Sequence, residues 1–198
     1  MSEAEAASLS LDCRPGKSGN LLVFPYTLTN NGPGEVYAMH ALPGADPSSG
    51  EARADDRAAI VIAGEGGEVI VGKFIAPLPS DRRIALLVVP LARRLAAGAS
   101  LEGRIEISLP FAETSPYFPD LTLRRYEIVE VKGVEFSIGY WPSAPERMRA
   151  EPCAYAPELF EIEMREPARE ARRISRRFPT SGLQLFRRLD AFPRALGG

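Results

Sequence analysis

Apolar and polar residues take alternate positions in two neighbouring stretches of the chain, Leu22–Leu28 and Val36–Leu42. Residues 30–34, which read Asn-Asn-Gly-Pro-Gly, interrupt the pattern between them. Successive side chains of a β-strand point to opposite faces, and an interruption of this composition is typical of a turn. The pattern therefore predicts two β-strands that are joined by a turn.

The same pattern recurs along the chain, and we expect about eight or nine strands over roughly 135 residues. No long helix is predicted between them, so a parallel sheet built from βαβ units is not expected. The predicted strands are Leu9–Cys13, Asn20–Thr29, Gly34–Leu42, Ala59–Ala63, Glu68–Ile75, Ile84–Val89, Leu101–Leu109, Thr122–Val131 and Val134–Tyr140. Together they predict a mainly β protein whose fold is an antiparallel β-sandwich.

Several local features refine this prediction. Pro25 has no N–H to donate, so its strand is expected to lie at a sheet edge or to carry a bulge there. Ile84–Val89 is apolar on both faces, which indicates a central strand that is covered on two sides. Ala92–Gly98 is predicted to form a single helical turn. Gly64–Gly67 and Lys132–Gly133 are predicted to be hairpin turns.

The pattern changes after Pro142. We expect a disordered N-terminus at residues 1–7, the sandwich at 8–142, a proline-rich linker at 143–157 and a basic, partly helical extension at 158–198. Phe160–Met164 alternates and predicts one more strand, and Ala168–Arg177 predicts a short helix. A second helix, capped by Ser181, would present an apolar stripe made of Leu185, Phe186, Leu189 and Phe192.

Charge is divided unevenly between the two ends of the chain. Residues 165–198 hold nine arginines and three acidic residues, a net charge of +6. The whole chain holds 24 basic and 26 acidic residues, so residues 1–164 hold 15 and 23, a net charge of −8. Opposite charges favour an extension that lies back on a sandwich, either its own or that of a neighbouring molecule, with the apolar stripe supplying most of the docking energy.

This division leads to two functional hypotheses. In the first, the protein is a non-enzymatic interaction or assembly module, in a homodimer or with an unidentified protein partner, unless the extension only covers its own sandwich. In the second, the extension binds nucleic acid or another polyanion, although the acidic body would repel one. The arginines available for the second hypothesis are Arg172, Arg173, Arg176, Arg177, Arg187 and Arg188.

Aromatic residues near the end of the predicted sandwich are further candidates for partner contact. Phe111, Tyr117 and Phe118 lie in a stretch with three prolines, which makes a stiff loop between two strands. Trp141 directly follows the last regular strand. Exposed aromatic side chains on a rigid loop are good contact residues. The alternative is that these side chains plug the end of the hydrophobic core.

Little in the sequence indicates catalysis. His40 is the only histidine, which excludes the multi-histidine sites of zinc and copper enzymes, and no serine lies in a Gly-x-Ser-x-Gly context. Cys13 and Cys153 are expected to be free thiols in a reducing compartment. We therefore expect no metal, no cofactor and no enzymatic activity. No run of 18 apolar residues exists and the N-terminus is acidic, so a cytoplasmic protein is expected.

The strand spacing and the turn Thr29-Asn30-Asn31-Gly32 resemble those of immunoglobulin-like and fibronectin-type β-sandwich modules. The resemblance covers residues 8–142. The Cys…Trp…Cys core of antibody-type domains is missing, because Cys13, Trp141 and Cys153 occur in a different order and spacing. Modules of this kind most often serve in binding or assembly, which the resemblance implies for this chain.

Overall fold

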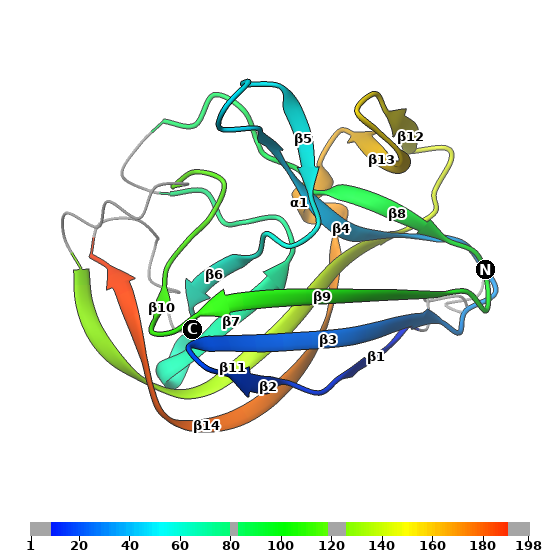
Figure 1. Cartoon of the computed structure of the whole chain (residues 1–198). Helices are drawn as coiled ribbons and strands as arrows, with labels where there is room; N and C mark the ends of the chain where they lie inside the picture. The colour runs from blue at the N-terminus through cyan, green and yellow to red at the C-terminus, as the bar shows by residue number, and fades with distance from the viewer. Residues whose placement is uncertain (1–8, 80–82, 119–125, 190–198) are drawn as a thin grey trace.

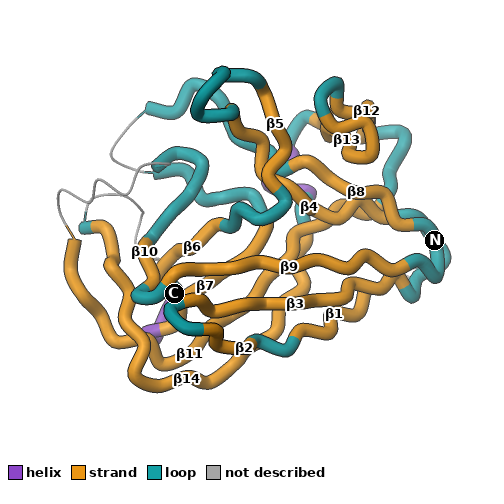
Figure 2. The backbone as a smooth tube through the Cα atoms, viewed as in Figure 1, coloured by secondary structure: helices purple, strands orange, loops and turns teal. Residues whose placement is uncertain are grey.

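The computed structural model describes residues 9–79, 83–118 and 126–189, and this part of the chain is almost entirely β-structure (Figures 1 and 2). Its helical elements are a 3-10 turn, η1 (Glu65–Gly67), and one short helix, α1 (Pro167–Glu170). The strands are β1 (Leu9–Cys13), β2 (Gly16–Ser18), β3 (Leu21–Asn30), β4 (Val36–Ala45), β5 (Ala52–Asp55), β6 (Ile60–Ala63), β7 (Glu68–Lys73), β8 (Leu91–Leu95), β9 (Ser100–Ser108), β10 (Phe111–Ala112), β11 (Tyr126–Pro142), β12 (Met148–Cys153), β13 (Ala156–Met164) and β14 (Arg172–Arg188). The mainly β prediction is confirmed.

The strands form two sheets. The smaller one has four antiparallel strands, with β3 between β9 on one side and β1 and β2 on the other. The larger one has ten strands in the order β10-β14-β11-β4-β8-β13-β12, with β5 added to β4, β7 to β11 and β6 to β7. The larger sheet is mixed, because β7 runs parallel to β11 and β10 parallel to β14. Within the described residues, no helix has the length and apolar character needed to cross a membrane.

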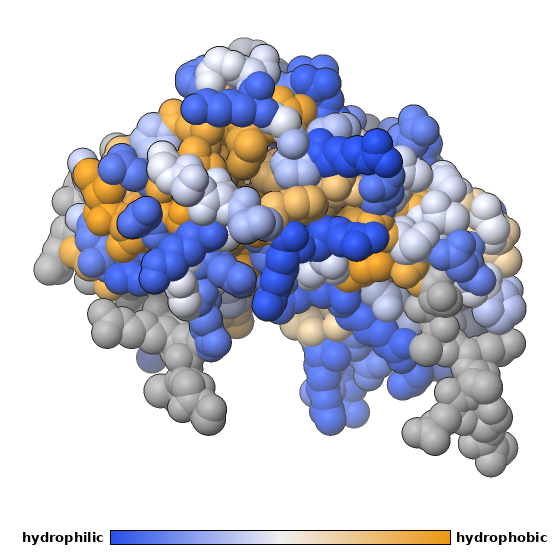
Figure 3. Space-filling view, turned by 90° about the horizontal axis from the view of Figure 1, so that it is seen from below, coloured by the Kyte–Doolittle hydropathy of each residue, from blue (hydrophilic) through white to orange (hydrophobic). Residues whose placement is uncertain are grey.

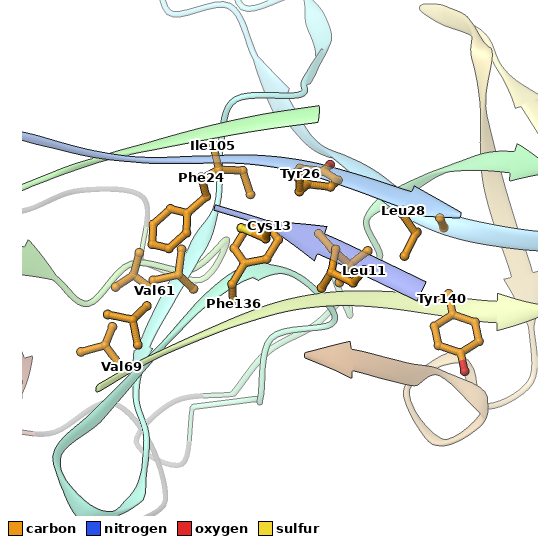
Figure 4. Close-up of a cluster of buried hydrophobic side chains, with 14 of the residues drawn as sticks. Leu11, Cys13, Phe24, Tyr26, Leu28, Val61, Val69, Ile105, Phe136 and Tyr140 are labelled. Carbon is orange, nitrogen blue, oxygen red and sulfur yellow. The ribbon is translucent and has the colours of Figure 1, made fainter. Parts of the chain in front are cut away.

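The main hydrophobic core lies between the two sheets. Side chains from β3 and β9 point toward those of β11, as Figure 4 shows for Phe24, Ile105 and Phe136. The rings of Phe24 and Phe136 stack with their centroids 5.2 Å apart. Contact between side chains of the two sheets is what fixes one layer on the other.

A second core covers the opposite face of the larger sheet. It gathers Tyr37 and Met39 from β4, Phe74, and Trp141 from β11. Trp141 is 1% exposed, and its indole N–H donates to the carbonyl of Pro167 at 3.0 Å. Because both faces of β4 are covered, its residues from Val36 to Leu42 are all buried.

The strands with clear alternation are confirmed. Predicted and observed strands agree for Leu9–Cys13, β3 and β9 lie within one residue of their predicted bounds, and β4 lies within three. β6 and β7 form the expected antiparallel hairpin around Gly64–Gly67. Side chains of β9 alternate between the core and solvent, with Leu101 and Ile105 buried. Phe160–Met164 lies in a strand, β13, as predicted.

The prediction that Pro25 lies in an edge strand or at a bulge needs correction, because β3 has neighbours on both sides and no register shift at Pro25. The strand on one side of β3 is nevertheless interrupted at this point, since β1 ends at Cys13 and β2 begins at Gly16. The carbonyl of Pro25 accepts the N–H of Arg14 at 3.4 Å, so Pro25 faces this interruption. The missing N–H of Pro25 therefore breaks no regular strand pairing.

Two predictions between residues 84 and 98 are wrong. Ile84–Val89 is not a strand, and Leu86 is 77% exposed. Prolines at positions 77, 79 and 90 flank this apolar stretch, which disfavours its pairing in a sheet. Ala92–Gly98 contains strand β8 in place of a helical turn, because pairing with β4 outweighs the helix propensity of its alanines and arginines.

Lys132–Gly133 is not a turn, and the two predicted strands around it are one strand, β11. The register of β11 with β14 shifts there, because Val131 lies opposite Leu183 and Gly133 opposite Pro179, so one residue of β11 faces three of β14. The extra residues of this bulge belong to β14, and both Val131 and Val134 of β11 lie in the main core.

The C-terminal extension is a strand in place of the predicted helices. Among residues 158–189 only Pro167–Glu170 is helical, and Arg172–Arg188 forms β14, which runs antiparallel along most of β11. The stretch predicted as a linker contains β12, which pairs with β13. The long edge of β11 supplies hydrogen-bond partners that an isolated segment lacks, which explains why strand pairing overrides the helical spacing. The predicted disordered N-terminus, residues 1–7, lies outside the described residues.

Candidate functional site

The basic extension pairs with the acidic body of its own chain. Arg187 donates from Nε to a carboxylate oxygen of Glu127 at 2.7 Å. Arg177 lies 3.0 Å from Glu135 and 3.8 Å from Glu68. Burial would raise the pKa of Glu135, but hydrogen bonds with Ser175 and Arg177 hold it below its usual range. The basic extension and the acidic part of the chain therefore neutralise each other within one molecule.

Other arginines of the extension also have partners within the chain. Arg176 donates from Nε to the carbonyl of Leu11 in β1 at 2.9 Å. The guanidinium of Arg173 lies 5.3 Å from the ring centre of Phe74, and that of Arg188 lies 4.6 Å from the ring centre of Phe118. Arg172 is exposed. These contacts engage most of the arginines that were candidates for polyanion binding.

Most of the predicted aromatic contact residues belong to the cores. Phe111 is fully buried, Trp141 and Leu185 are 1% exposed and Phe118 is 6% exposed. Tyr117 is half-buried, and its hydroxyl accepts the N–H of Val88 at 3.2 Å. These positions match the alternative in which the aromatic side chains plug the interior.

A small apolar strip remains exposed where β11 begins and β14 ends. Tyr126 and Ile128 of β11 are 46% and 56% exposed, and Leu189 just after β14 is 48% exposed. Half-buried Phe186 lies opposite Ile128 and packs edge-on against Tyr126, with 5.1 Å between ring centres. Phe192 lies outside the described residues. On the face seen from below, hydrophilic side chains interrupt the apolar patches (Figure 3).

A buried polar cluster surrounds the C-terminal end of β7. Lys73, at the end of β7, is fully buried, and its ammonium group donates to the backbone carbonyls of His40 and Asp56. His40 lies where the register of β4 with β8 shifts, so it is the bulged residue of β4. Lys73 therefore joins the β4 bulge to the connection between β5 and β6.

Burial sets the protonation of this cluster. It lowers the pKa of Lys73 to about 8, against the opposing effect of Asp56. Burial, then the charges of Lys73 and Arg93, lower the pKa of His40 to about 4. In the described part of the chain, His40 Nδ1 and the Tyr26 hydroxyl are buried without a hydrogen-bond partner. Lys73 is sealed from solvent, so the arrangement serves to fasten the fold and offers no group that a substrate can reach.

The thiols and carboxylates offer no reactive centre either. Burial, and then the charge of Asp12, raise the pKa of the Cys13 thiol to about 12, so it stays protonated and unreactive. Cys153 is 1% exposed and also free. No group of three His, Cys, Asp or Glu side chains with metal-binding geometry occurs among residues 9–79, 83–118 and 126–189.

Glu113 is a structural residue in the proline-rich loop. It is 2% exposed, and its carboxylate accepts the backbone N–H groups of Ala63 at 2.7 Å and of Arg188 at 2.6 Å. Burial raises the pKa of Glu113, and these two hydrogen bonds oppose the rise. The side chain thereby holds the ends of β6 and β14 together.

An open pocket of about 370 Å³ lies between the β2–β3 turn and β14. Its polar side chains are those of Lys17, Asn20 and Gln184, with Leu109 and Leu183 among the apolar ones. One ammonium group and two amides do not form a catalytic or metal-binding set.

The most distinctive surface is the free edge of β9. In the described chain, β9 pairs with β3 alone, over nine successive residues without a register shift. Figures 1 and 2 show β3 along one side of β9 and no strand along the other. An unpaired edge presents a row of backbone donors and acceptors to a further strand.

The register shows which backbone groups of β9 point outward. Arg104 lies opposite Pro25, which faces away from β9 toward Arg14. In an antiparallel pair, both backbone groups of a residue point to the same side, so those of Arg104 point away from β3. The Ala99 carbonyl accepts from Asn30 at 2.9 Å and the Leu109 N–H donates to Asn20 at 2.7 Å, which fits this alternation. The outward residues are Ser100, Glu102, Arg104, Glu106 and Ser108.

Other edges in the described chain carry features that blunt them. β14 contains Pro179, and β10 pairs with its last residues. β12 contains Pro152 next to a register shift, and β5 has only four residues. The second side of β6 is occupied at Val61, which bridges to Thr114. β9 contains no proline and no bulge, and its only charged residues project from the face of the sheet and not across its edge.

Sequence reasoning missed both the β9 edge and Lys73. The regular, proline-free alternation of residues 100–108 was a signal for a long strand, but the number of its neighbours depends on the topology. A single lysine within the apolar stretch Val69–Ile75 was a signal for a buried charge. The fold and this edge together define a two-sheet β protein with one long unprotected edge. No family model, curated protein or solved structure matches this chain.

Proposed function

We propose that this protein is a non-enzymatic protein-binding module that adds an extended strand of a protein partner to the free edge of β9. The observation that carries the proposal is a nine-residue strand that has one neighbour among the described residues. In strand addition, main-chain hydrogen bonds supply affinity and alternate side chains supply specificity. Here the outward-facing residues Glu102, Arg104 and Glu106 would supply the specificity.

The side chains that could serve catalysis or polyanion binding are buried or paired with other residues of the same chain. Lys73 and His40 are buried in the polar cluster, and Cys13 is a buried, protonated thiol. The arginines of β14 contact Glu127, Glu135 and Leu11, which leaves polyanion binding with less support than strand addition.

The immunoglobulin-like character of the fold is part of this proposal. Two sheets that share one core, and the Asn-Gly turn after β3, support it. The parallel pairing of β7 with β11 departs from the antiparallel pattern of such modules. We also propose a cytoplasmic location, which is supported by the free thiols Cys13 and Cys153 in a β-rich protein of this size.

A synthetic peptide tests strand addition without knowledge of the natural partner. In this peptide valine alternates with arginine, glutamate and arginine, so that its charges oppose Glu102, Arg104 and Glu106. We expect the peptide to shift the backbone amide NMR signals of these residues and to slow their exchange with solvent. The same peptide with N-methyl groups on its pairing amides is the control and should have no effect. Absence of both changes at saturating peptide would overturn the proposal.

A further inference from the structure

We infer that the strand which β9 receives is β9 of a second copy of this chain, in an antiparallel pair related by a two-fold axis. This inference rests on the proposed function, because it names the partner of the same edge. Two observations carry it: the charge order along the outward residues, and the position of the Tyr26 hydroxyl beside Gly103.

Backbone geometry restricts how two copies of β9 can pair. Residues whose backbone groups point outward must oppose each other to exchange hydrogen bonds. The two-fold axis therefore lies at one residue of β9, and that residue opposes the same residue of the other copy. An axis through Arg104 would place Arg104 opposite itself and Glu102 opposite Glu106, which are like charges. An axis through Gly103 places Glu102 of each copy opposite Arg104 of the other. An axis through Ile105 places Arg104 opposite Glu106.

The side chains on the inner face of the smaller sheet favour an axis at Gly103 over one at Ile105. The Tyr26 ring lies directly over Gly103, since a Cβ atom added at Gly103 would be 2.3 Å from the Tyr26 hydroxyl oxygen. This hydroxyl is buried and has no partner within the described chain. An axis at Gly103 places the Tyr26 rings of the two copies on either side of the axis, and each hydroxyl, which its own chain covers, gains a partner when it turns outward over Gly103. It also sets Leu101 of one copy beside Ile105 of the other, which continues the apolar inner face.

Glu102, Arg104 and Glu106 are exposed on the outer face, so charge changes there leave the monomer fold intact. Arg104 has an intrachain ion pair with Glu106 at 2.7 Å, and the side chain of Arg104 is 62% exposed. Such an exposed pair contributes little to stability. Changes in assembly among the charge variants therefore report on the contact between copies.

The test is a set of charge variants measured by sedimentation velocity over a micromolar concentration series. We expect a dimer for the natural sequence and a dissociation constant raised roughly tenfold or more by Arg104→Glu. The double variant Glu102→Arg/Arg104→Glu restores opposite charges for the Gly103 axis and should dimerise again. The matched double variant Arg104→Glu/Glu106→Arg should stay weakened, because Glu102 then opposes a glutamate.

Three other results would overturn the β9–β9 dimer or its axis. A natural chain that stays monomeric at every concentration overturns the inference, and the proposed function survives if the synthetic peptide still binds β9. A dimer that is indifferent to all three variants overturns the inference as well, because another surface then forms it. Recovery by Arg104→Glu/Glu106→Arg in place of the other double variant overturns the Gly103 axis.

Discussion

β14 and β9 are both long strands that carry several charged residues, and the structure uses them in opposite ways. The arginines of β14 meet Glu127, Glu135 and Leu11 of the same chain, and Leu185 is buried in the main core. The charges of β9 project from a strand that has one neighbour within the part of the chain that the structure describes. The comparison shows that a pattern of charged residues indicates an interaction, but not whether the interacting groups belong to the same chain or to another molecule. Changes in β14 should therefore affect stability, and changes in β9 should affect binding.

Truncation of the chain after Met164 should have the largest effect. The truncated chain loses β14, which pairs with β11 from Tyr126 to Tyr140, and exposes the core around Leu185. We expect the loss of cooperative unfolding, because the removed contacts match the marginal stability of a domain, about 5–15 kcal/mol. Thermal unfolding followed by circular dichroism measures this. A truncated chain with the melting temperature of the full chain would show that β14 is dispensable.

Leu185→Ala should destabilise the protein by about 2–5 kcal/mol, because it opens a cavity in the core. Leu185 is 1% exposed, whereas Leu189, a few residues further along, is 48% exposed. Leu189→Ala is thus the matched control, and it should change the free energy of unfolding by less than about 0.5 kcal/mol. Chemical denaturation of both variants gives the comparison. Equal effects would contradict the buried position of β14.

Proline substitutions in β9 distinguish the edge that pairs with β3 from the free edge. Ile107→Pro removes an N–H that points to β3, so it should cost about 3 kcal/mol of stability. Arg104→Pro removes an N–H that points outward, so it should cost no more than about 1 kcal/mol and abolish binding of the synthetic peptide. Chemical denaturation and peptide titration measure the two effects. The assignment of the free edge is wrong if Arg104→Pro is the more destabilising of the two.

The stability of the buried polar cluster should depend on pH. The pKa of His40 falls from 6.5 to about 4 on folding, so the unfolded chain binds more protons between these values. The contribution of neutral His40 is present above pH 6.5 and is lost as the pH falls toward 4. The expected loss is about 2 kcal/mol between about pH 7 and about pH 5. Urea unfolding of the natural chain and of His40→Gln isolates it. Identical pH profiles for the two would contradict the burial of His40.

The sequence was sufficient for elements whose pattern is local. The alternation in residues 22–28 and 101–109 predicted β3 and most of β9, because one face of each strand meets the core. β8 and β14 were mistaken for helices, since alanine, arginine and apolar residues at helical spacing carry no information about an available neighbouring strand. The position of a segment beside β4 or β11 is a property of the whole topology.

The candidate site was predicted less well than the fold, for the same reason. The arginines and aromatic residues chosen from the sequence are conspicuous by type, and most of them are used internally. Glu102, Arg104 and Glu106 are ordinary by type. Their importance comes from the absence of a second neighbour for β9 in the described chain.

Amide hydrogen exchange along β9, followed residue by residue with NMR in dilute solution, is the decisive measurement for strand addition at β9. We expect slow exchange for Gly103, Ile105 and Ile107, whose N–H groups point to β3, and fast exchange for Glu102, Arg104 and Glu106. Raising the protein concentration should slow the second set toward the first. Equal protection of Arg104 and Gly103 in the dilute monomer would mean that the edge is already occupied, and it would contradict strand addition at β9.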